Sequence, residues 1–295
     1  MQILLTVIVA TLSASAQHAT SAADPLVITP TQLAQQLNDP DLVILHVGNR
    51  ATYDAGHIPG ARFADRAQLS VSGDAANGLT LQMPPADILH DRLAALGVSD
   101  ASRIVVYESD DMWSPATRVL FTLDYAGLSH VSWLDGGLAA WKSANQPVTA
   151  EVAAPRAAGT LSPLKLRATI VDADFVQSHA HAPGFAIVDA RNPQYYDGRQ
   201  PGGPAGYQKS GHIPGAVNAP FDTFVTSDIR LKSTDEIASA FTKAGVRPGD
   251  TVIAYCHIGQ QATATIFAAR LAGHPVLLYD GSFEDWAKRG LPVEK

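Results

Sequence analysis

A six-residue motif, Gly-His-Ile-Pro-Gly-Ala, occurs twice in this chain, at 56–61 and at 211–216. The two copies are 155 residues apart (211 − 56), and the same order of predicted strands and helices surrounds each of them. Each half also closes on an Asp-Gly turn followed by tryptophan and proline, with twelve residues from aspartate to proline in both (147 − 135 and 292 − 280). The repeat therefore predicts two domains of one fold.

The apolar patterns predict the elements of both halves. In the first half they predict helices near 30–37, 85–96 and 115–126 and strands over 43–47, 103–107 and 130–134. In the second half they predict helices over 170–179, 233–244 and 262–271 and strands over 186–189, 251–255 and 276–279. Alternating short strands and helices predict an α/β fold, with a parallel sheet and helices on both of its faces in each domain.

Composition sets the domain bounds and the class of partner. The chain has 295 residues, of which 46% are hydrophobic and 17% charged, and this is enough for two ordinary domains. We expect them at 24–148 and 169–295, joined by an Ala- and Pro-rich linker over 149–168. The net charge of −7, without a Lys/Arg cluster, gives no reason to expect nucleic acid or an anionic membrane as a partner.

The N-terminus resembles a secretory signal. An apolar run of about ten residues, too short to span a bilayer, precedes Ala14-Ser15-Ala16, which matches a signal peptidase site. We therefore expect residues 1–23 to be a signal peptide and the mature protein to be exported, to the periplasm. The run lacks a preceding Lys or Arg, so a start further upstream or a buried first helix remain the alternatives.

Cys256 is the only cysteine, so it forms no internal disulfide. It follows the predicted strand 251–255 and precedes the predicted helix 262–271, and in such a turn the backbone N–H groups of 257–261 are free to point at the sulfur. Gly259 allows the turn to bend tightly. These features predict an anion cradle and a thiol pKa below that of a free cysteine. The alternative is a small buried hydrophobic residue.

The two motif copies, the closing Asp-Gly turns with Trp141 and Trp286, and Cys256 at a strand end together resemble the rhodanese family of sulfurtransferases in its tandem two-domain form. The resemblance implies that only the C-terminal domain carries the cysteine, in a loop of pattern Cys-x-x-Gly-x-(Arg/Thr). Residues 256–261 fit that pattern except at Gln261. Glu108 takes the place of the cysteine in the first domain, which implies that this domain is catalytically silent.

Several residues besides Cys256 are candidate contacts for an anionic substrate. Arg191 belongs to the Asp-x-Arg sequence that starts at Asp189, and it either faces the incoming anion or forms a structural pair with that aspartate. Arg199, in the polar insertion 195–209, is a second candidate. The loop itself supplies His257, Ile258, Gly259, Gln260 and Gln261, of which His257 either binds the anion or turns outward. The scattered histidines have no metal-ligand spacing, and no cofactor is expected.

The resemblance implies transfer of a sulfane sulfur from a small anionic donor to cyanide or a thiol through a persulfide on Cys256. The bulky, polar loop favours thiosulfate as the donor, and 3-mercaptopyruvate is the alternative. A phosphatase of related fold would need an arginine one residue beyond the loop, where Ala262 stands. A non-catalytic sulfur carrier or binding module is a further alternative. The sequence leaves the oligomeric state open, with a monomer as the expectation.

Overall fold

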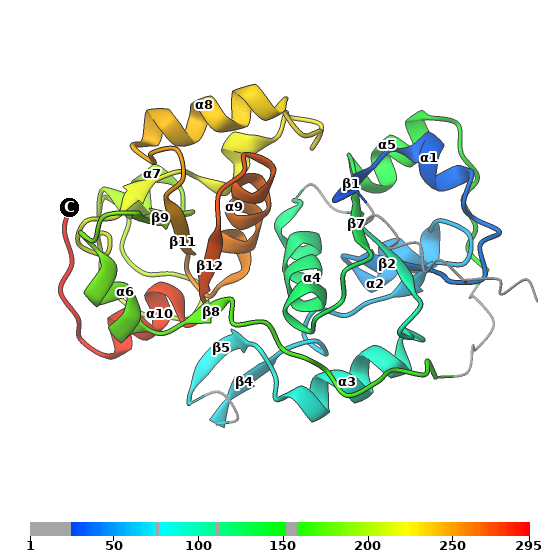
Figure 1. The fold of residues 1–295 in the computed structure, drawn as a ribbon, viewed down its shortest axis with the longest axis horizontal. Coiled ribbons are helices and arrows are strands. Elements are labelled where there is room, and N and C mark those ends of the chain that lie inside the picture. The colour runs from blue at the N-terminus through cyan, green and yellow to red at the C-terminus, as the bar shows by residue number, and fades with distance from the viewer. Residues whose placement is uncertain (1–24, 75–76, 110–111, 152–157) are drawn as a thin grey trace, which may run out of the picture.

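The computed structural model describes residues 25–74, 77–109, 112–151 and 158–295. The predicted signal peptide lies outside the described residues, as does part of the predicted linker. Two α/β domains lie side by side, and helices α4 (Ser114–Tyr125) and α9 (Gln260–Leu271) face each other between them (Figure 1). The two-domain α/β fold predicted from the repeat is thus present.

The first domain is built on a parallel five-stranded sheet in the order β1-β7-β6-β2-β3. Its strands are β1 (Val27–Ile28), β2 (Leu42–Val47), β3 (Arg62–Phe63), β6 (Arg103–Glu108) and β7 (Val131–Leu134). Its other helices are α1 (Pro30–Ala34), α2 (Arg50–Ala55), α3 (Ala86–Ala95) and α5 (Gly137–Ser143).

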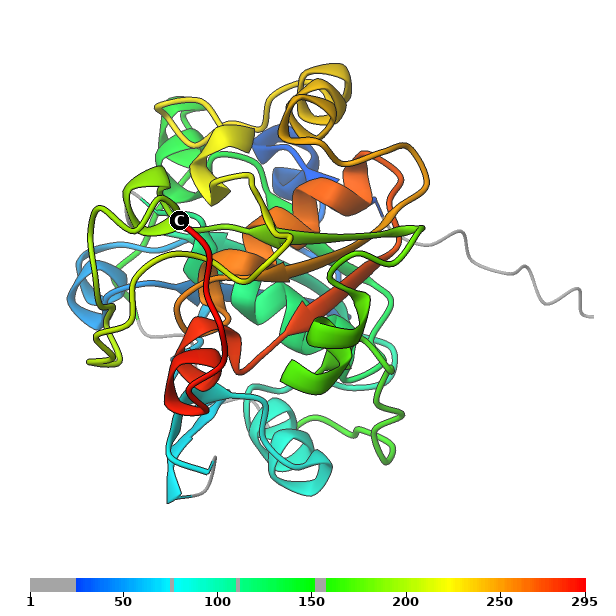
Figure 2. The same cartoon turned by 90° about the vertical axis from the view of Figure 1, so that its left-hand side faces the viewer.

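The second domain repeats that topology. Its parallel sheet has the order β10-β9-β11-β12-β8, which is the order of the first sheet read from the other edge. Its strands are β8 (Ile170–Val171), β9 (Phe185–Asp189), β10 (Val217–Asn218), β11 (Thr251–Tyr255) and β12 (Val276–Tyr279). Its other helices are α6 (Ala173–His179), α7 (Pro193–Tyr196), the 3-10 helix η2 (Phe221–Phe224), α8 (Thr234–Ala244) and α10 (Ser282–Lys288). Figure 2 views the molecule from the side of this domain, with the C-terminal segment that follows α10 in front.

Alternation along the strands divides the core into layers. In β2, Val43 and Leu45 pack on the face that carries α3 and α4, whereas Leu42 and Ile44 pack on the face that carries α1 and α5. The layer containing α4 continues without a break into the second domain, where it includes α9 and Cys256. Helices thus cover both faces of each sheet. The core layer that contains α4 and α9 is shared by the two domains.

The repeated tryptophans and motifs have structural roles. Trp141 Nε1 donates to the carbonyl of Pro147 at 2.7 Å, and Trp286 Nε1 donates to that of Pro292 at 2.6 Å. These bonds account for the equal aspartate-to-proline spacing in the two halves. The backbone of His57 in the first motif forms an isolated β-bridge with that of Thr149. The second motif forms the same kind of bridge with a residue near the C-terminus.

The structure differs from the predicted elements in two places that bear on the site. The segment after the first motif, expected to be a polar loop, contains an antiparallel hairpin of β4 (Val71–Gly73) and β5 (Leu79–Gln82). Its Thr80 donates from both the backbone and the hydroxyl to the buried carboxylate of Glu284 in α10. Helix α9 begins at Gln260, two residues earlier than predicted, so the cysteine loop is shorter and the helix N-terminus is closer to the sulfur.

Candidate active site

Cys256 lies between the end of β11 and the start of α9, and its side chain is 1% exposed. Four backbone N–H groups lie close enough to its sulfur to favour negative charge there, those of Ile258, Gly259, Gln261 and Ala262. The helix N-terminus adds a partial positive charge to these donors. The predicted anion cradle is therefore present in the geometry, with Ala262 as a donor that the sequence did not predict.

The electrostatics of the thiol differ from the prediction. Burial raises the pKa of the Cys256 thiol above its ordinary value, and the four N–H groups act in the opposite direction without overcoming burial. The expectation of a lowered pKa is therefore wrong for the resting protein. The four N–H groups interact more strongly with a negative charge than with a neutral thiol. They are therefore suited to stabilise an anion that forms on the sulfur during a reaction.

Backbone geometry holds the loop in place. Gly259 has φ +84°, and a Cβ there would lie 2.9 Å from the Asp280 carbonyl oxygen and 3.0 Å from Arg118 Nη1, so both the conformation and the space require glycine. The backbone N–H of Cys256 donates to Ser282 Oγ at 3.1 Å, and that hydroxyl donates in turn to the Tyr279 carbonyl at 2.9 Å. The closing turn of the second repeat thus supports the cysteine directly.

The N-terminal domain also contacts the loop, through an arginine that the sequence analysis missed. Arg118 of α4 is 2% exposed, and its Nη1 donates to Asp280 Oδ1 at 2.6 Å and to the Gly259 carbonyl at 3.3 Å. Its Nη2 donates to the Leu81 carbonyl in β5. An arginine in the middle of a mostly apolar predicted helix was the signal available in the sequence. One guanidinium therefore joins the hairpin, the loop and the closing turn.

Two further contacts cross from α4 to the start of α9. Gln260 Nε2 donates to Ser114 Oγ at 3.2 Å, and the hydroxyls of Thr117 and Thr263 lie 3.0 Å apart. The side chain of Gln260 is thus directed to the other domain. Gln261 belongs to the cradle through its backbone N–H, and its side-chain Oε1 is buried without a hydrogen-bond partner in the described part of the chain.

Arg191 is engaged in a structural pair. It is 1% exposed, and it binds Asp189 through Nε and Nη2, with the shortest contact at 2.6 Å. Nη2 also donates to the Gly211 carbonyl at 2.8 Å, and the guanidinium lies 4.0 Å from the centroid of the Phe283 ring. Of the two interpretations of this residue, the geometry favours the structural pair.

Arg199 does not join the other candidates. Its guanidinium is 68% exposed and pairs with Asp197 at 2.7 Å on the surface. The geometry therefore does not support a contact between Arg199 and an incoming anion.

His257 points into the protein, toward the polar insertion. Its Nδ1 lies 2.5 Å from the hydroxyl oxygen of Tyr207, a second residue that the sequence analysis missed. Burial, together with the positive charge of Arg191, lowers the pKa of His257 to about 4. The ring is therefore neutral at neutral pH, and His257 does not place a cation next to the sulfur.

Glu108 occupies the place of the cysteine in the first domain. The equivalence is visible in the preceding tyrosines, because Tyr107 accepts the Ile58 N–H as Tyr255 accepts the Ile213 N–H. Burial raises the pKa of Glu108 to about 8, and its Oε2 accepts from Trp133 Nε1 at 2.7 Å. A buried carboxyl group cannot accept a sulfur atom, so this position is suited to structure and not to transfer.

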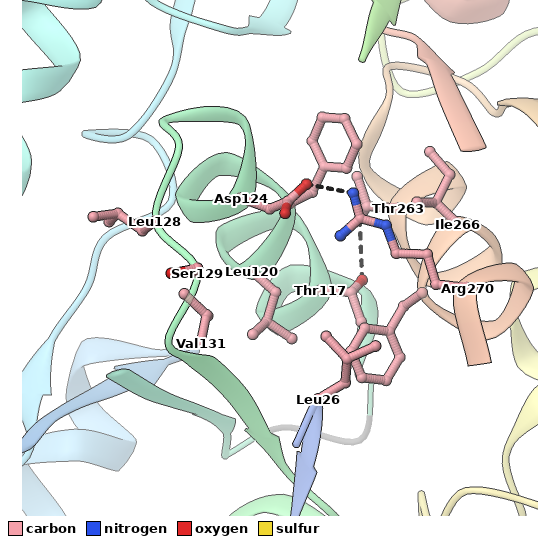
Figure 3. Close-up of a pocket in the computed structure, with 12 residues that line it drawn as sticks. Leu26, Thr117, Leu120, Asp124, Leu128, Ser129, Val131, Thr263, Ile266 and Arg270 are labelled. Carbon is pink, nitrogen blue, oxygen red and sulfur yellow. Dashed lines mark hydrogen bonds and ion pairs between the residues drawn. The ribbon is translucent and has the colours of Figure 1, made fainter. Parts of the chain in front are cut away.

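A pocket between α4, α9 and β7 lies apart from the cysteine loop (Figure 3). It is mostly apolar, with the Asp124–Arg270 ion pair at its edge, and no residue of 256–261 lines it. Among the described residues, no group of three His, Cys, Asp or Glu side chains is placed to hold a metal. In the same part of the chain, no helix is long and apolar enough to cross a membrane.

Comparison with known proteins identifies the class. The rhodanese-like domain matches residues 29–144 and 172–289, which together make up most of the chain. The protein therefore belongs to the rhodanese family, with two domains of that type in tandem. The fold agrees with this assignment. So does the similar surrounding of the cysteine position and of its equivalent in the first domain.

Individual relatives define the type of reaction. The chain is 32% identical over 272 residues to the thiosulfate sulfurtransferase of Azotobacter vinelandii, covering 92% of this chain and 97% of that protein. It is 34% identical over 251 residues to the 3-mercaptopyruvate sulfurtransferase of Rattus norvegicus, covering 82% and 81%. The crystal structure of the 3-mercaptopyruvate sulfurtransferase of Escherichia coli matches with a TM-score of 0.76 and 29% identity, covering 87% and 98%. The protein is a sulfurtransferase, and identity alone does not separate the two donors.

Proposed function

We propose that Cys256 is the nucleophile of this sulfurtransferase and that thiosulfate is its donor. The observation that carries the proposal is the set of four N–H groups, from Ile258, Gly259, Gln261 and Ala262, on the sulfur of the only cysteine. Such a cradle stabilises negative charge at a fixed point, and it does so without reorganisation at the moment of reaction.

The reaction has two steps. After the thiol loses its proton to solvent, the thiolate attacks the outer sulfur of thiosulfate, the S–S bond of the donor breaks, and sulfite leaves with the bonding electron pair. The enzyme then carries a persulfide anion on Cys256, which the N–H groups stabilise. In the second step, cyanide or a thiolate attacks the outer sulfur, and the Cys256 thiolate is released.

The choice of thiosulfate rests on where the arginines lie. A keto acid such as 3-mercaptopyruvate would need a cation for its carboxylate. Arg191 is occupied by Asp189 and Gly211, and Arg199 pairs with Asp197 on the surface. Arg118 is paired with Asp280. Thiosulfate presents three sulfonate oxygens that can accept hydrogen bonds from neutral N–H donors, whereas a carboxylate has two, so thiosulfate fits this lining better.

The nucleophile is tested by intact mass spectrometry after incubation with thiosulfate. We expect a gain of one sulfur atom in the wild-type protein and none in Cys256→Ser, because a serine hydroxyl is not ionised at neutral pH and cannot carry sulfur. Ser178 of α6 provides a control, since this exposed serine lies outside the cysteine loop and Ser178→Ala should still gain sulfur. Labelling of Cys256→Ser, or no labelling of the wild-type protein by any donor, would contradict the assignment, and the latter would favour a binding module.

The donor is tested by steady-state kinetics with both donors and one common acceptor. We expect a higher kcat/KM for thiosulfate. A kcat/KM at least tenfold higher for 3-mercaptopyruvate would reject thiosulfate as the preferred donor and direct attention to a carboxylate contact other than Arg191 or Arg199.

A further inference from the structure

The ring of His257, the residue that follows the cysteine, is enclosed by two tyrosines from the insertion between β9 and β10. Tyr207 approaches Nδ1 with its hydroxyl oxygen at 2.5 Å, and both side chains are 7% exposed. Tyr195 packs edge-on against the same ring, with the centroids 4.5 Å apart. Tyr207 also lies close enough to Cys256 for a charge on the sulfur to act on its hydroxyl group. The insertion thus forms a hydrogen bond with the residue that follows the cysteine.

The direction of this hydrogen bond follows from the neighbouring charge. Arg191 is near enough for its positive charge to act on the Tyr207 hydroxyl group, and a guanidinium, which only donates hydrogen bonds, favours the oxygen lone pairs on its side. The hydroxyl proton therefore points away from Arg191, at His257 Nδ1, which is the acceptor placed to receive it. A buried hydroxyl proton without an acceptor would be costly. When Nδ1 accepts, a neutral imidazole carries its proton on Nε2.

We propose that Tyr207 is a positioning residue that holds His257 as a neutral imidazole protonated on Nε2, so that the sulfur site offers the donor anion a fixed N–H group instead of a titrating cation. The inference rests on the proposed function in one respect, namely that an anion binds at the Cys256 loop. The tautomer itself is a property of the resting protein.

The charges around the ring agree with a neutral state. The charged and titratable groups on the neighbouring elements are Asp189 and Arg191 at the end of β9, Tyr195 in α7, Tyr207 in the insertion, and the adjacent Cys256. Burial and Arg191 both lower the pKa of His257, and the opposing influence of Asp189 is smaller. Asp189 is neutralised by Arg191 and accepts from the Tyr255 hydroxyl at 2.7 Å. Among the described residues, the ring therefore meets no carboxylate other than this neutralised one that would hold a second proton.

The backbone of the insertion is shaped around the same hydrogen bond. Gly203 packs on it so closely that a Cβ there would lie 2.5 Å from the Tyr207 hydroxyl oxygen and 2.7 Å from His257 Nδ1. Contacts below 3.0 Å force a neighbour to move, so Gly203→Ala would separate the two side chains. Its backbone conformation is one that alanine can adopt, since no positive φ is present at this glycine.

The first test is spectroscopic and needs no donor. Ring ¹⁵N chemical shifts of His257 should show the Nε2–H tautomer in the wild-type protein from pH 5.5 to 8. Tyr207→Phe should mix the two tautomers and raise the pKa of His257. Tyr196→Phe is the matched control, because the Tyr196 hydroxyl donates to the Ala216 carbonyl at 2.8 Å and not to the loop. An Nδ1–H tautomer or a titration above pH 6 in the wild-type protein overturns the proposal.

The second test is the pH profile of kcat/KM for thiosulfate. Tyr207→Phe should raise KM about two- to tenfold, the range expected when one neutral hydrogen bond is misdirected. Its profile of kcat/KM against pH should also show an ionisation of the His257 ring between pH 5 and 7, which the wild-type and Tyr196→Phe proteins lack. An unchanged profile in Tyr207→Phe would overturn the role in the reaction. If Tyr207→Phe does not fold, Gly203→Ala is measured instead. A wild-type protein with the Nε2–H tautomer that forms no persulfide would refute the proposed function and not the tautomer.

Discussion

Cys256 is subject to two opposing influences, and they act at different stages of a reaction. In the resting protein, burial favours the uncharged thiol. Once charge is on the sulfur, the four N–H groups of the loop and the start of α9 have their full effect. The structure therefore combines a protected resting thiol with a site prepared for a persulfide anion.

Alkylation of Cys256 by iodoacetamide, a small neutral reagent, measures the resting thiol. Because the raised pKa favours the protonated form in the folded protein, little thiolate is present at neutral pH, and the rate should increase as the pH rises. We expect an apparent pKa above the value of about 8.5 of a free cysteine. The control is the same protein unfolded in urea, which should give the value of a free thiol. A midpoint below the control would show that the N–H groups outweigh burial.

At the scale of elements, helix α4 of the N-terminal domain takes part in the site. Its Arg118 binds the Gly259 carbonyl of the loop, Asp280 of the closing turn and the Leu81 carbonyl of the hairpin. The first domain therefore has a role in spite of Glu108, because it supplies side chains that the second domain does not provide for itself.

Arg118→Lys should weaken this support while keeping the positive charge. A lysine ammonium cannot reproduce the fork that reaches three acceptors, so we expect the free energy of unfolding to fall by about 1–3 kcal/mol. The kcat/KM for sulfur transfer should fall as well, because Gly259 carries one of the N–H groups on the sulfur. Chemical denaturation and steady-state kinetics measure the two effects.

Arg50→Lys is the control for this substitution. Arg50 pairs with Asp54 within a helix of the same domain, and both side chains are more than half exposed. Exposed pairs of this kind contribute little, so neither stability nor kcat/KM should change. Arg118→Lys with wild-type kcat/KM would mean that α4 supports only the fold.

At the scale of the whole molecule, the two domains share one core. Phe267 of α9 packs edge-on against two tryptophans of the first domain, with ring centroids 6.3 Å from Trp113 and 6.0 Å from Trp133. Helix α9 thus buries its side chains against the other domain as well as against its own sheet. Neither domain can complete its core without the other.

Phe267→Ala tests this shared core. We expect a loss of about 3–5 kcal/mol in the free energy of unfolding, as for other large core truncations. Wild-type and variant proteins should each melt in one cooperative transition, because the residue contacts both domains. Differential scanning calorimetry measures both quantities. Two separate transitions in the wild-type protein, with only the second shifted by the substitution, would show that the domains are energetically independent.

The sequence by itself determined the features that are local or repeated along the chain. The duplicated motif predicted two domains of one topology, and the apolar patterns predicted most strands and helices, because backbone periodicity is written into consecutive residues. The repeat also placed Glu108 at the position equivalent to Cys256. The strand and helix predicted on either side of the cysteine predicted the turn around the sulfur.

Only the tertiary structure decided the rest. Arg118 and Gly259 are 141 residues apart and Tyr207 and His257 are 50 apart, so no local pattern joins them. Arg191 and Arg199 resemble each other in the sequence, but one is buried in a pair and the other is on the surface. The pKa of Cys256 depends on how completely the two domains exclude water from it. Desolvation and contacts between distant segments arise from packing of the whole molecule, and a reading of neighbouring residues cannot supply them.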